Sequence, residues 1–280
     1  MELTNELLNR ERPLVIAHRG NKTIYPENTL FALTDAVKLG VDILEVDTRL
    51  TCDRQLVIFH DETLERTTNG KGNVSDKSLE EIKQLDAGYH FAVDNGLTFP
   101  YRGKGLQILT LQEAFEQFPE TAFNIDIKNL EALAVDVLAS LIKENHREDT
   151  VLVGSFHDIQ IKRFRKRMPT VKTAAGPSEV KRFLYATRFY LTRAIRPKYN
   201  VFQVPLTIRQ KRRSFRIVEI VTPRFIKQAH SKGISVMVWT VNNPAIMKRL
   251  IKDGVDGIFT DDAATLISII QNMQEKKQSP

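Results

Sequence analysis

Short apolar runs with the length of buried strands alternate with amphipathic, helix-like segments along nearly the whole chain. Cap residues mark the helices: Gly40 ends one that begins at Asn28, and Thr222-Pro223 and Asn243-Pro244 open two others. The pattern predicts strands over residues 14–17, 41–47, 56–59, 122–127, 151–154, 234–240 and 255–260. Helices are predicted over residues 28–39 and 130–145 and after the two proline-containing starts. This alternation is typical of an α/β protein with a parallel sheet, most economically a closed (β/α)8 barrel.

Two features interrupt the regular alternation. Residues 62–107 form a long, polar, Gly-containing stretch, which we interpret as a small insertion after the third strand. Nine strand-like runs compete for eight barrel positions if residues 171–174 and 201–204 are both counted. We expect one barrel domain over residues 13–270, followed by a polar tail at 271–280.

Composition places the chain among folded, water-soluble proteins. Of its 280 residues, 42% are hydrophobic, which is enough for a large core. No apolar run approaches the roughly 18 residues that span a bilayer. The first ten residues include Glu2 and no apolar segment, so we expect no secretory signal. Cys52 is the only cysteine, which excludes an intrachain disulfide and a cysteine-based metal site. We therefore expect a soluble, cytoplasmic, single-domain protein.

Charge is distributed unevenly along the chain. The 41 Lys and Arg residues outnumber the 34 Asp and Glu residues, for a net charge of +7. Residues 162–216 alone hold 17 Lys and Arg against one acid, Glu179, or +16, which leaves −9 for the rest. Such asymmetry indicates that one surface faces an anionic partner: nucleic acid, phospholipid headgroups or a phosphorylated metabolite.

Charged side chains and histidines gather where the predicted strands end. In a barrel of this kind, functional side chains lie at the carboxyl ends of the strands. That rule selects His18, Arg19, Glu45, Asp47, His60, Asp61, Asp126 and Lys128. Residues two apart on a strand point to the same face, so Glu45 and Asp47 lie together, as do Asp126 and Lys128.

Three carboxylates at one barrel mouth repel one another unless a cation lies between them. Oxygen-only ligands suit Mg²⁺ or Ca²⁺ better than Zn²⁺. For one carboxylate pair alone, a salt bridge to a neighbouring Lys or Arg would be the simpler interpretation. Two such strand ends beside two histidines favour a functional site, because an imidazole can donate or accept a proton near pH 7.

Several short motifs, in order and at familiar spacing, resemble those of the glycerophosphodiester phosphodiesterase family. They are His18-Arg19-Gly20, Pro26-Glu27-Asn28-Thr29, Glu45-Val46-Asp47, His60-Asp61, Glu65-Arg66-Thr67-Thr68-Asn69-Gly70, residues 124–128, Trp239-Thr240-Val241-Asn242 and residues 257–261. The resemblance covers roughly residues 13–270. It implies a TIM barrel with a small insertion after the third strand, which matches residues 62–107.

The resemblance also implies roles for individual residues. His18 and His60 would be the acid–base pair, and Arg19 and Lys128 would bind the phosphate. Glu45, Asp47 and Asp126 would hold one divalent cation, Mg²⁺ or Ca²⁺, with Mn²⁺ as a third candidate. The family more often has Glu where this chain has Asp126. Trp239 would line the pocket, and packing in a buried strand explains it equally well.

These roles imply metal-dependent hydrolysis of a glycerophosphodiester to an alcohol and sn-glycerol 3-phosphate. One histidine would take a proton from the nucleophile and the other would protonate the leaving group. The glycerol 2-hydroxyl is held near phosphorus, so it can attack first and form a cyclic phosphate. One alternative is a lysophospholipase D that acts on a lysophospholipid and releases lysophosphatidic acid. A non-enzymatic alternative is a barrel that binds anionic lipid or nucleic acid.

The basic segment has two interpretations of equal weight. Residues 180–197 show apolar side chains at helical spacing, with basic residues and Tyr185, Phe189 and Tyr190 between them. A barrel helix with a solvated exterior explains this pattern, and so does an element that contacts an anionic membrane surface peripherally. The basic run at 209–213 would extend the same surface. No nucleic-acid-binding module accompanies the charge, and no obligate protein partner is implied.

Overall fold

The computed structural model describes residue 8 and residues 12–210 and 216–278. Within them, parallel strands neighbour one another in the order β6-β5-β4-β2-β1-β11-β10-β7. A parallel bridge between Ala174 and Val201 joins the two ends of this order and completes the ring. The strands are β1 (Leu14–His18), β2 (Ile43–Leu50), β4 (Ala122–Ile127), β5 (Val151–Gly154), β6 (Lys172–Thr173), β7 (Val201–Pro205), β10 (Ser235–Trp239) and β11 (Gly257–Thr260). The expected (β/α)8 barrel is confirmed.

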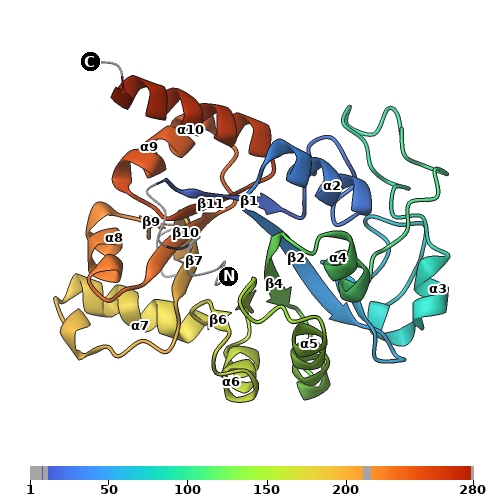
Figure 1. Cartoon of the computed structure of the whole chain (residues 1–280), viewed down its shortest axis with the longest axis horizontal. Coiled ribbons are helices and arrows are strands. Elements are labelled where there is room, and N and C mark those ends of the chain that lie inside the picture. The colour runs from blue at the N-terminus through green and yellow to red at the C-terminus, as the bar shows by residue number, and fades with distance from the viewer. Residues whose placement is uncertain (1–7, 9–11, 211–215, 279–280) are drawn as a thin grey trace.

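Helices cover the outside of the barrel (Figure 1). They are α2 (Leu30–Leu39), α4 (Leu111–Gln117), α5 (Ala132–Glu144), α6 (Asp158–Arg167), α7 (Pro177–Arg188), α8 (Pro223–His230), α9 (Pro244–Asp253) and α10 (Ala263–Gln278). As expected, Asn243 caps α9 and a left-handed Gly40 ends α2. The N-cap of α2 is Thr29, not Asn28. Asn28 has a φ of 59°, outside the extended region that an N-cap requires, and its side chain faces Asp47.

The third strand in chain order, β3 (Leu56–Ile58), does not belong to the barrel ring. It pairs antiparallel with the end of β2, with Thr48 opposite Ile58. Both candidate runs, at 171–174 and 201–204, supply ring strands, so β3 is the ninth run. The insertion follows it, contains η1 (Val74–Asp76) and α3 (Leu79–Lys83), and has its own apolar cluster. His60 and Asp61 therefore enter the barrel mouth from the start of the insertion.

The helix predicted over 180–197 is shorter than the sequence pattern indicates. Helix α7 ends at Arg188, Tyr190 adopts a left-handed φ of 59°, and a short turn, η2 (Thr192–Ala194), follows. Leu191 continues the apolar spacing of residues 180–197 beyond the end of the helix, and it is 62% exposed. The amphipathic pattern continues past the helix, but the left-handed residue redirects the chain.

A two-stranded hairpin of β8 (Thr207–Gln210) and β9 (Arg216–Glu219) follows β7. The predicted basic run at 209–213 falls largely on residues 211–215, which lie outside the described part of the chain. The first ten residues, where we expect no secretory signal, also lie mostly outside the described part. Of the predicted polar tail at 271–280, residues 271–278 are helical as the end of α10, and residues 279–280 lie outside the described part. In the described part, no helix combines the length and apolarity needed to cross a bilayer.

Candidate active site

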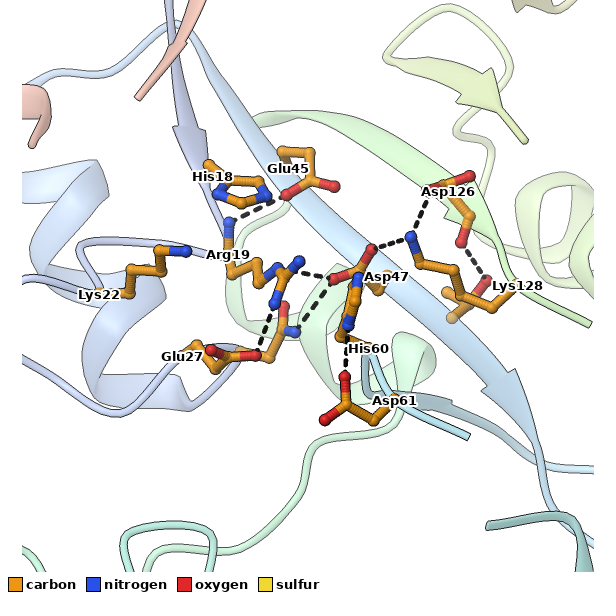
Figure 2. Close-up of polar contacts among 12 residues, drawn as sticks. His18, Arg19, Lys22, Glu27, Glu45, Asp47, His60, Asp61, Asp126 and Lys128 are labelled. Carbon is orange, nitrogen blue, oxygen red and sulfur yellow. Dashed lines mark hydrogen bonds and ion pairs between the residues drawn. The ribbon is translucent and has the colours of Figure 1, made fainter. Parts of the chain in front are cut away.

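Neighbouring strand ends place the predicted site residues side by side. Parallel register sets His18 of β1 beside Glu45 of β2, and Asp47 of β2 beside Asp126 of β4. Figure 2 shows these side chains gathered around one space, with Lys128 beside them. One cavity of about 850 Å³ is lined by eight of the predicted site residues: His18, Arg19, Glu45, Asp47, His60, Asp126, Lys128 and Trp239. Asp61, which the strand-end rule also selects, does not line it and instead contacts His60.

Two cations neutralise part of the carboxylate cluster. The Lys128 ammonium lies 2.7 Å from Asp47 Oδ1 and 2.5 Å from Asp126 Oδ2. Arg19 Nε lies 3.1 Å from Asp47 Oδ2, and the Arg19 backbone amide donates to Glu45 Oε2 at 3.0 Å. Burial favours a raised pKa for Asp47, but Lys128 and Arg19 outweigh it and lower that pKa below its ordinary value. Asp47 is therefore ionised and doubly paired.

The other two carboxylates are compensated less completely. Burial and the charge of Asp47 raise the pKa of Glu45 well above its ordinary value. Burial also raises the pKa of Asp126, and its Oδ1 is buried without a hydrogen-bond partner. Such under-neutralised carboxylate oxygens are the donors that hard divalent cations prefer, so the residues fit a cation of that class.

The described residues contain no group of three His, Cys, Asp or Glu side chains already arranged around one ion position. Instead, the Lys128 ammonium lies between Asp47 and Asp126 (Figure 2). The fold thus places the predicted ligands on the adjoining strands β2 and β4, and Lys128 pairs with two of them.

His18 is held by a carboxylate at the far end of the chain. Its Nδ1 lies 2.7 Å from Asp261 Oδ1, just after β11, and Asp261 also accepts from Asn242 and pairs with Lys22. Burial lowers the pKa of His18, although the Asp261 hydrogen bond opposes this. With Nδ1 engaged, Nε2 is the ring nitrogen that can exchange a proton with a ligand.

His60 is held in a parallel manner. Its Nδ1 lies 2.6 Å from Asp61 Oδ1, and Arg66 pairs with both Asp61 and Glu27. Glu27 in turn accepts from Arg19 at 2.8 Å. Burial opposes ionisation of Glu27, but Arg66 and Arg19 lower its pKa to about 2. Arg66 therefore connects Asp61, which holds His60, to Glu27, which holds Arg19.

Sequence reasoning gave no role to three of these supporting residues: Asp261, Glu27 and Arg66. Asp261 directly follows the last barrel strand, so the strand-end rule alone was sufficient to select it. Glu27 and Arg66 stand inside the family-like motifs but on loops, and only the folded chain shows which groups they contact.

Trp239 ends β10 and lines the cavity. Its ring meets Phe156 edge to face, with centroids 5.5 Å apart, and Phe156 is 57% exposed. Trp239 also packs against the apolar cluster inside the barrel. The two interpretations of Trp239, pocket lining and core packing, are therefore compatible, because the side chain packs on the core and also faces the cavity.

The model of the glycerophosphoryl diester phosphodiesterase family matches residues 18–265, and the chain belongs to this family. A glycerophosphodiester phosphodiesterase of Caldanaerobacter subterraneus is 36% identical over 93% of this chain and 98% of its own length. Human lysophospholipase D GDPD1 is 27% identical over 92% of this chain and 86% of its own length.

Solved structures show the same fold. The glycerophosphoryl diester phosphodiesterase domain of Rv2277c from Mycobacterium tuberculosis superposes with a TM-score of 0.81 at 21% identity, over 94% of this chain and all of that one. An Oleispira antarctica phosphodiesterase, solved with the product sn-glycerol-3-phosphate, superposes with a TM-score of 0.73 at 27% identity. The match covers 93% of this chain and 97% of that one.

Proposed function

We infer that this chain hydrolyses glycerophosphodiesters to an alcohol and sn-glycerol 3-phosphate. The observation that carries this inference is the arrangement of His18 and His60. Each is held through Nδ1 by an aspartate, and both face one cavity that also contains buried carboxylates and cations. Membership of the family and the named activity of the 36% identical relative support the same reaction.

The cationic side chains of the cavity bind the phosphate of the substrate. A phosphodiester is anionic, so its charge must be neutralised before an oxygen nucleophile approaches phosphorus. Arg19 and Lys128 lie in the cavity and carry that charge on side chains already fixed by Asp47 and Glu27. Fixed donors lose little entropy when they bind a phosphate, which favours them as its anchors.

Proton transfer falls to the two histidines. When the substrate 2-hydroxyl attacks phosphorus, one imidazole Nε2 accepts its proton while the other protonates the departing alkoxide. A phosphorus–oxygen bond to the 2-oxygen forms and the bond to the alcohol breaks, which leaves a cyclic phosphate. Water then opens the ring with the proton transfers reversed, and both imidazoles return to their starting states. Asp61 and Asp261 fix the tautomer of each ring throughout.

We propose that Glu45, Asp47 and Asp126 hold one divalent cation, Mg²⁺ or Ca²⁺, with Mn²⁺ as a third candidate. The unpaired Asp126 Oδ1 and the under-neutralised Glu45 support this assignment. When bound, the ion would supply positive charge next to the phosphate. The cation would compete with Lys128 for Asp47 and Asp126.

Removal of divalent cations is expected to lower kcat/KM for glycerophosphocholine by about 100-fold or more, because charge neutralisation contributes several kcal/mol. The measurement is choline release by protein treated with a chelator and then dialysed. Adding back Mg²⁺, Ca²⁺ or Mn²⁺ separately should restore the rate for at least one ion. Full activity at a metal content far below the protein concentration would exclude the proposed cation site.

We propose that the basic segment contacts anionic membrane peripherally. Tyr185, Phe189, Tyr190 and Leu191 are between 56% and 76% exposed at the end of α7. Basic residues surround them, and Arg224 stacks on the Tyr190 ring at 3.7 Å. Each Lys or Arg near an anionic surface contributes about 1 kcal/mol, so five acting together suffice for weak, reversible attachment.

Flotation is expected to recover the protein with anionic liposomes at low salt and not with neutral ones. Because the attraction is electrostatic, binding should fall steeply as salt rises. The double variant R182E/R193E should lose binding, while K71E, a charge reversal in the distant insertion, should retain it. If the wild-type protein does not float with anionic vesicles at low salt, the segment is a solvated helix end.

A barrel that only binds lipid or nucleic acid does not account for this site. Binding alone requires neither of the two aspartate-held histidines nor the buried carboxylates. The enzymatic function accounts for both.

A further inference from the structure

Arg66, in the insertion that follows β3, contacts two carboxylates that support the site. Its Nε donates to Asp61 Oδ2, and its terminal nitrogens Nη1 and Nη2 donate to the Glu27 carboxylate at 3.0 and 2.6 Å. The guanidinium thus uses each of its nitrogens in one planar arrangement. An ammonium group is a single point charge without this fork of donors, so a lysine could not hold both carboxylates in the same way.

Each of the two carboxylates holds a different functional side chain. Asp61 Oδ1 lies 2.6 Å from His60 Nδ1, and Glu27 Oε1 accepts from Arg19 Nη1 at 2.8 Å (Figure 2). One arginine therefore fixes the partner of a proposed acid–base histidine and the partner of a proposed phosphate-binding arginine. Arg66 itself does not line the cavity, so it acts on a substrate there only through these two partners.

The insertion fixes the backbone on either side of Arg66. Leu64 is fully buried in the apolar cluster of the insertion, and its amide donates to the Gly72 carbonyl at 3.0 Å. Thr68 is also buried, and its hydroxyl donates to the Leu64 carbonyl at 2.7 Å. These contacts close a tight loop with Arg66 at its centre. The insertion therefore presents the guanidinium at a fixed position beside the barrel mouth.

Arg19 depends on outside support because its backbone is strained. Its φ of 60° lies in the left-handed region, which residues other than glycine adopt rarely and keep only where their surroundings hold them. Two carboxylates contact its side chain, Glu27 at 2.8 Å and Asp47 at 3.1 Å. Asp47 is shared with Lys128. Glu27 is shared with Arg66, so the position of Glu27, and of Arg19 with it, follows that of Arg66.

We propose that Arg66 is a positioning residue that aligns His60 and Arg19 with each other for the reaction at the phosphodiester. This inference rests on the proposed function and assigns a task to the insertion. A shift of about 1 Å in a catalytic group can cost about 100-fold in rate. Arg66 is 48% exposed, and exposed ion pairs contribute little to folding. Loss of Arg66 should therefore impair the reaction far more than the stability of the fold.

The experiment measures kcat and KM for glycerophosphocholine, with the activating divalent cation, in the wild-type protein, R66A, R66K and R167A. R66A should lower kcat, because His60 loses its alignment, and raise KM, because Arg19 does too. Together these changes should lower kcat/KM by about 10- to 100-fold. R66K keeps the charge without the fork of donors and should resemble R66A; it also repeats the test if R66A fails to fold. R167A removes another exposed ion pair, that of Arg167 with Asp136, and should leave both constants unchanged.

Chemical rescue tests the geometry directly. Because Arg66 is about half exposed, free guanidinium ion can enter the space that R66A leaves and pair with Asp61 and Glu27 again. At concentrations far below those that denature the protein, guanidinium chloride should raise kcat and lower KM of R66A. Methylammonium chloride and sodium chloride at the same concentration should not, and guanidinium should not stimulate R167A.

The outcomes separate the two claims. If R66A or R66K keeps more than half of the wild-type kcat/KM, the positioning role is overturned and the proposed function stands. A fall in kcat at unchanged KM that guanidinium does not reverse also overturns it, because that pattern indicates a smaller folded fraction. A wild-type protein that hydrolyses no phosphodiester overturns the proposed function, and the positioning role with it.

Discussion

Replacing His18 or His60 by alanine is expected to lower kcat for glycerophosphocholine by about 10²- to 10⁴-fold, the usual contribution of general acid–base catalysis. Each ring is positioned by its own aspartate, at 2.7 Å for His18 and 2.6 Å for His60, so neither histidine can carry out the proton transfer of the other. Because the two histidines act in one proton-transfer sequence, the double variant should be little worse than the poorer single variant.

Two further variants separate chemistry from structure in this prediction. D261N keeps the shape of the partner of His18 but weakens its hold on the tautomer, so kcat should fall while KM changes little. H230A is the matched control, because His230 is exposed on α8 and pairs with Asp256 away from the cavity. A single histidine variant that keeps more than half of the wild-type kcat would contradict the acid–base assignment.

Replacing Lys128 by methionine is expected to destabilise the protein by about 3 kcal/mol, because it leaves Asp126 as an unpaired buried charge and removes one of the two cations that pair with Asp47. The side chains of Asp47 and Asp126 are only 2% and 11% exposed, so water cannot replace the ammonium fully. The change also removes a side chain that binds the phosphate, so kcat/KM should fall as well as the stability.

Chemical denaturation of K128M with and without divalent cation tests this account independently of activity. If Glu45, Asp47 and Asp126 form a cation site, Mg²⁺ or Ca²⁺ should raise the free energy of unfolding of K128M more than that of the wild-type protein. K77M is the matched control: the Lys77–Glu81 pair is exposed, so its loss costs about 0–1 kcal/mol. If the free energy of unfolding falls no more in K128M than in K77M, the buried carboxylates are neutralised by other means.

Local signals in the sequence sufficed to predict most barrel elements. Thr222-Pro223, Asn243-Pro244 and Gly40 act through short-range geometry, and the structure has caps at all three. Strand position also predicted which side chains meet, because parallel strands end at one mouth. Glu45 and Asp126 are far apart in the chain, yet they lie on adjoining strands.

Non-local pairing accounts for most of what the sequence did not show. The run that became β3 has the same apolar character as a barrel strand, and only its antiparallel pairing with β2 places it outside the ring. The contact of His18 with Asp261 spans 243 residues. At Tyr190, a left-handed backbone ends a helical pattern that side-chain periodicity alone would extend.

The charge balance of the mouth was also hidden from the sequence. Residue spacing predicted three carboxylates and one lysine near each other, but not that Lys128 would lie between Asp47 and Asp126. Side-chain reach decides this, since a flexible lysine two residues after Asp126 can turn back onto its own strand end. A divalent cation at this site would therefore compete with Lys128 for Asp47 and Asp126.

The most direct test of the central claim is the identity of the bond that breaks in glycerophosphocholine. Phosphorus-31 NMR of a reaction run in ¹⁸O-labelled water with divalent cation should show sn-glycerol 3-phosphate that carries the label. Mass spectrometry of the same reaction should show an equal amount of unlabelled choline. H18A and H60A should give the same two products at rates about 10²- to 10⁴-fold lower. Release of phosphocholine and glycerol, or no hydrolysis by the wild-type protein with any of the three cations, would contradict the proposed function.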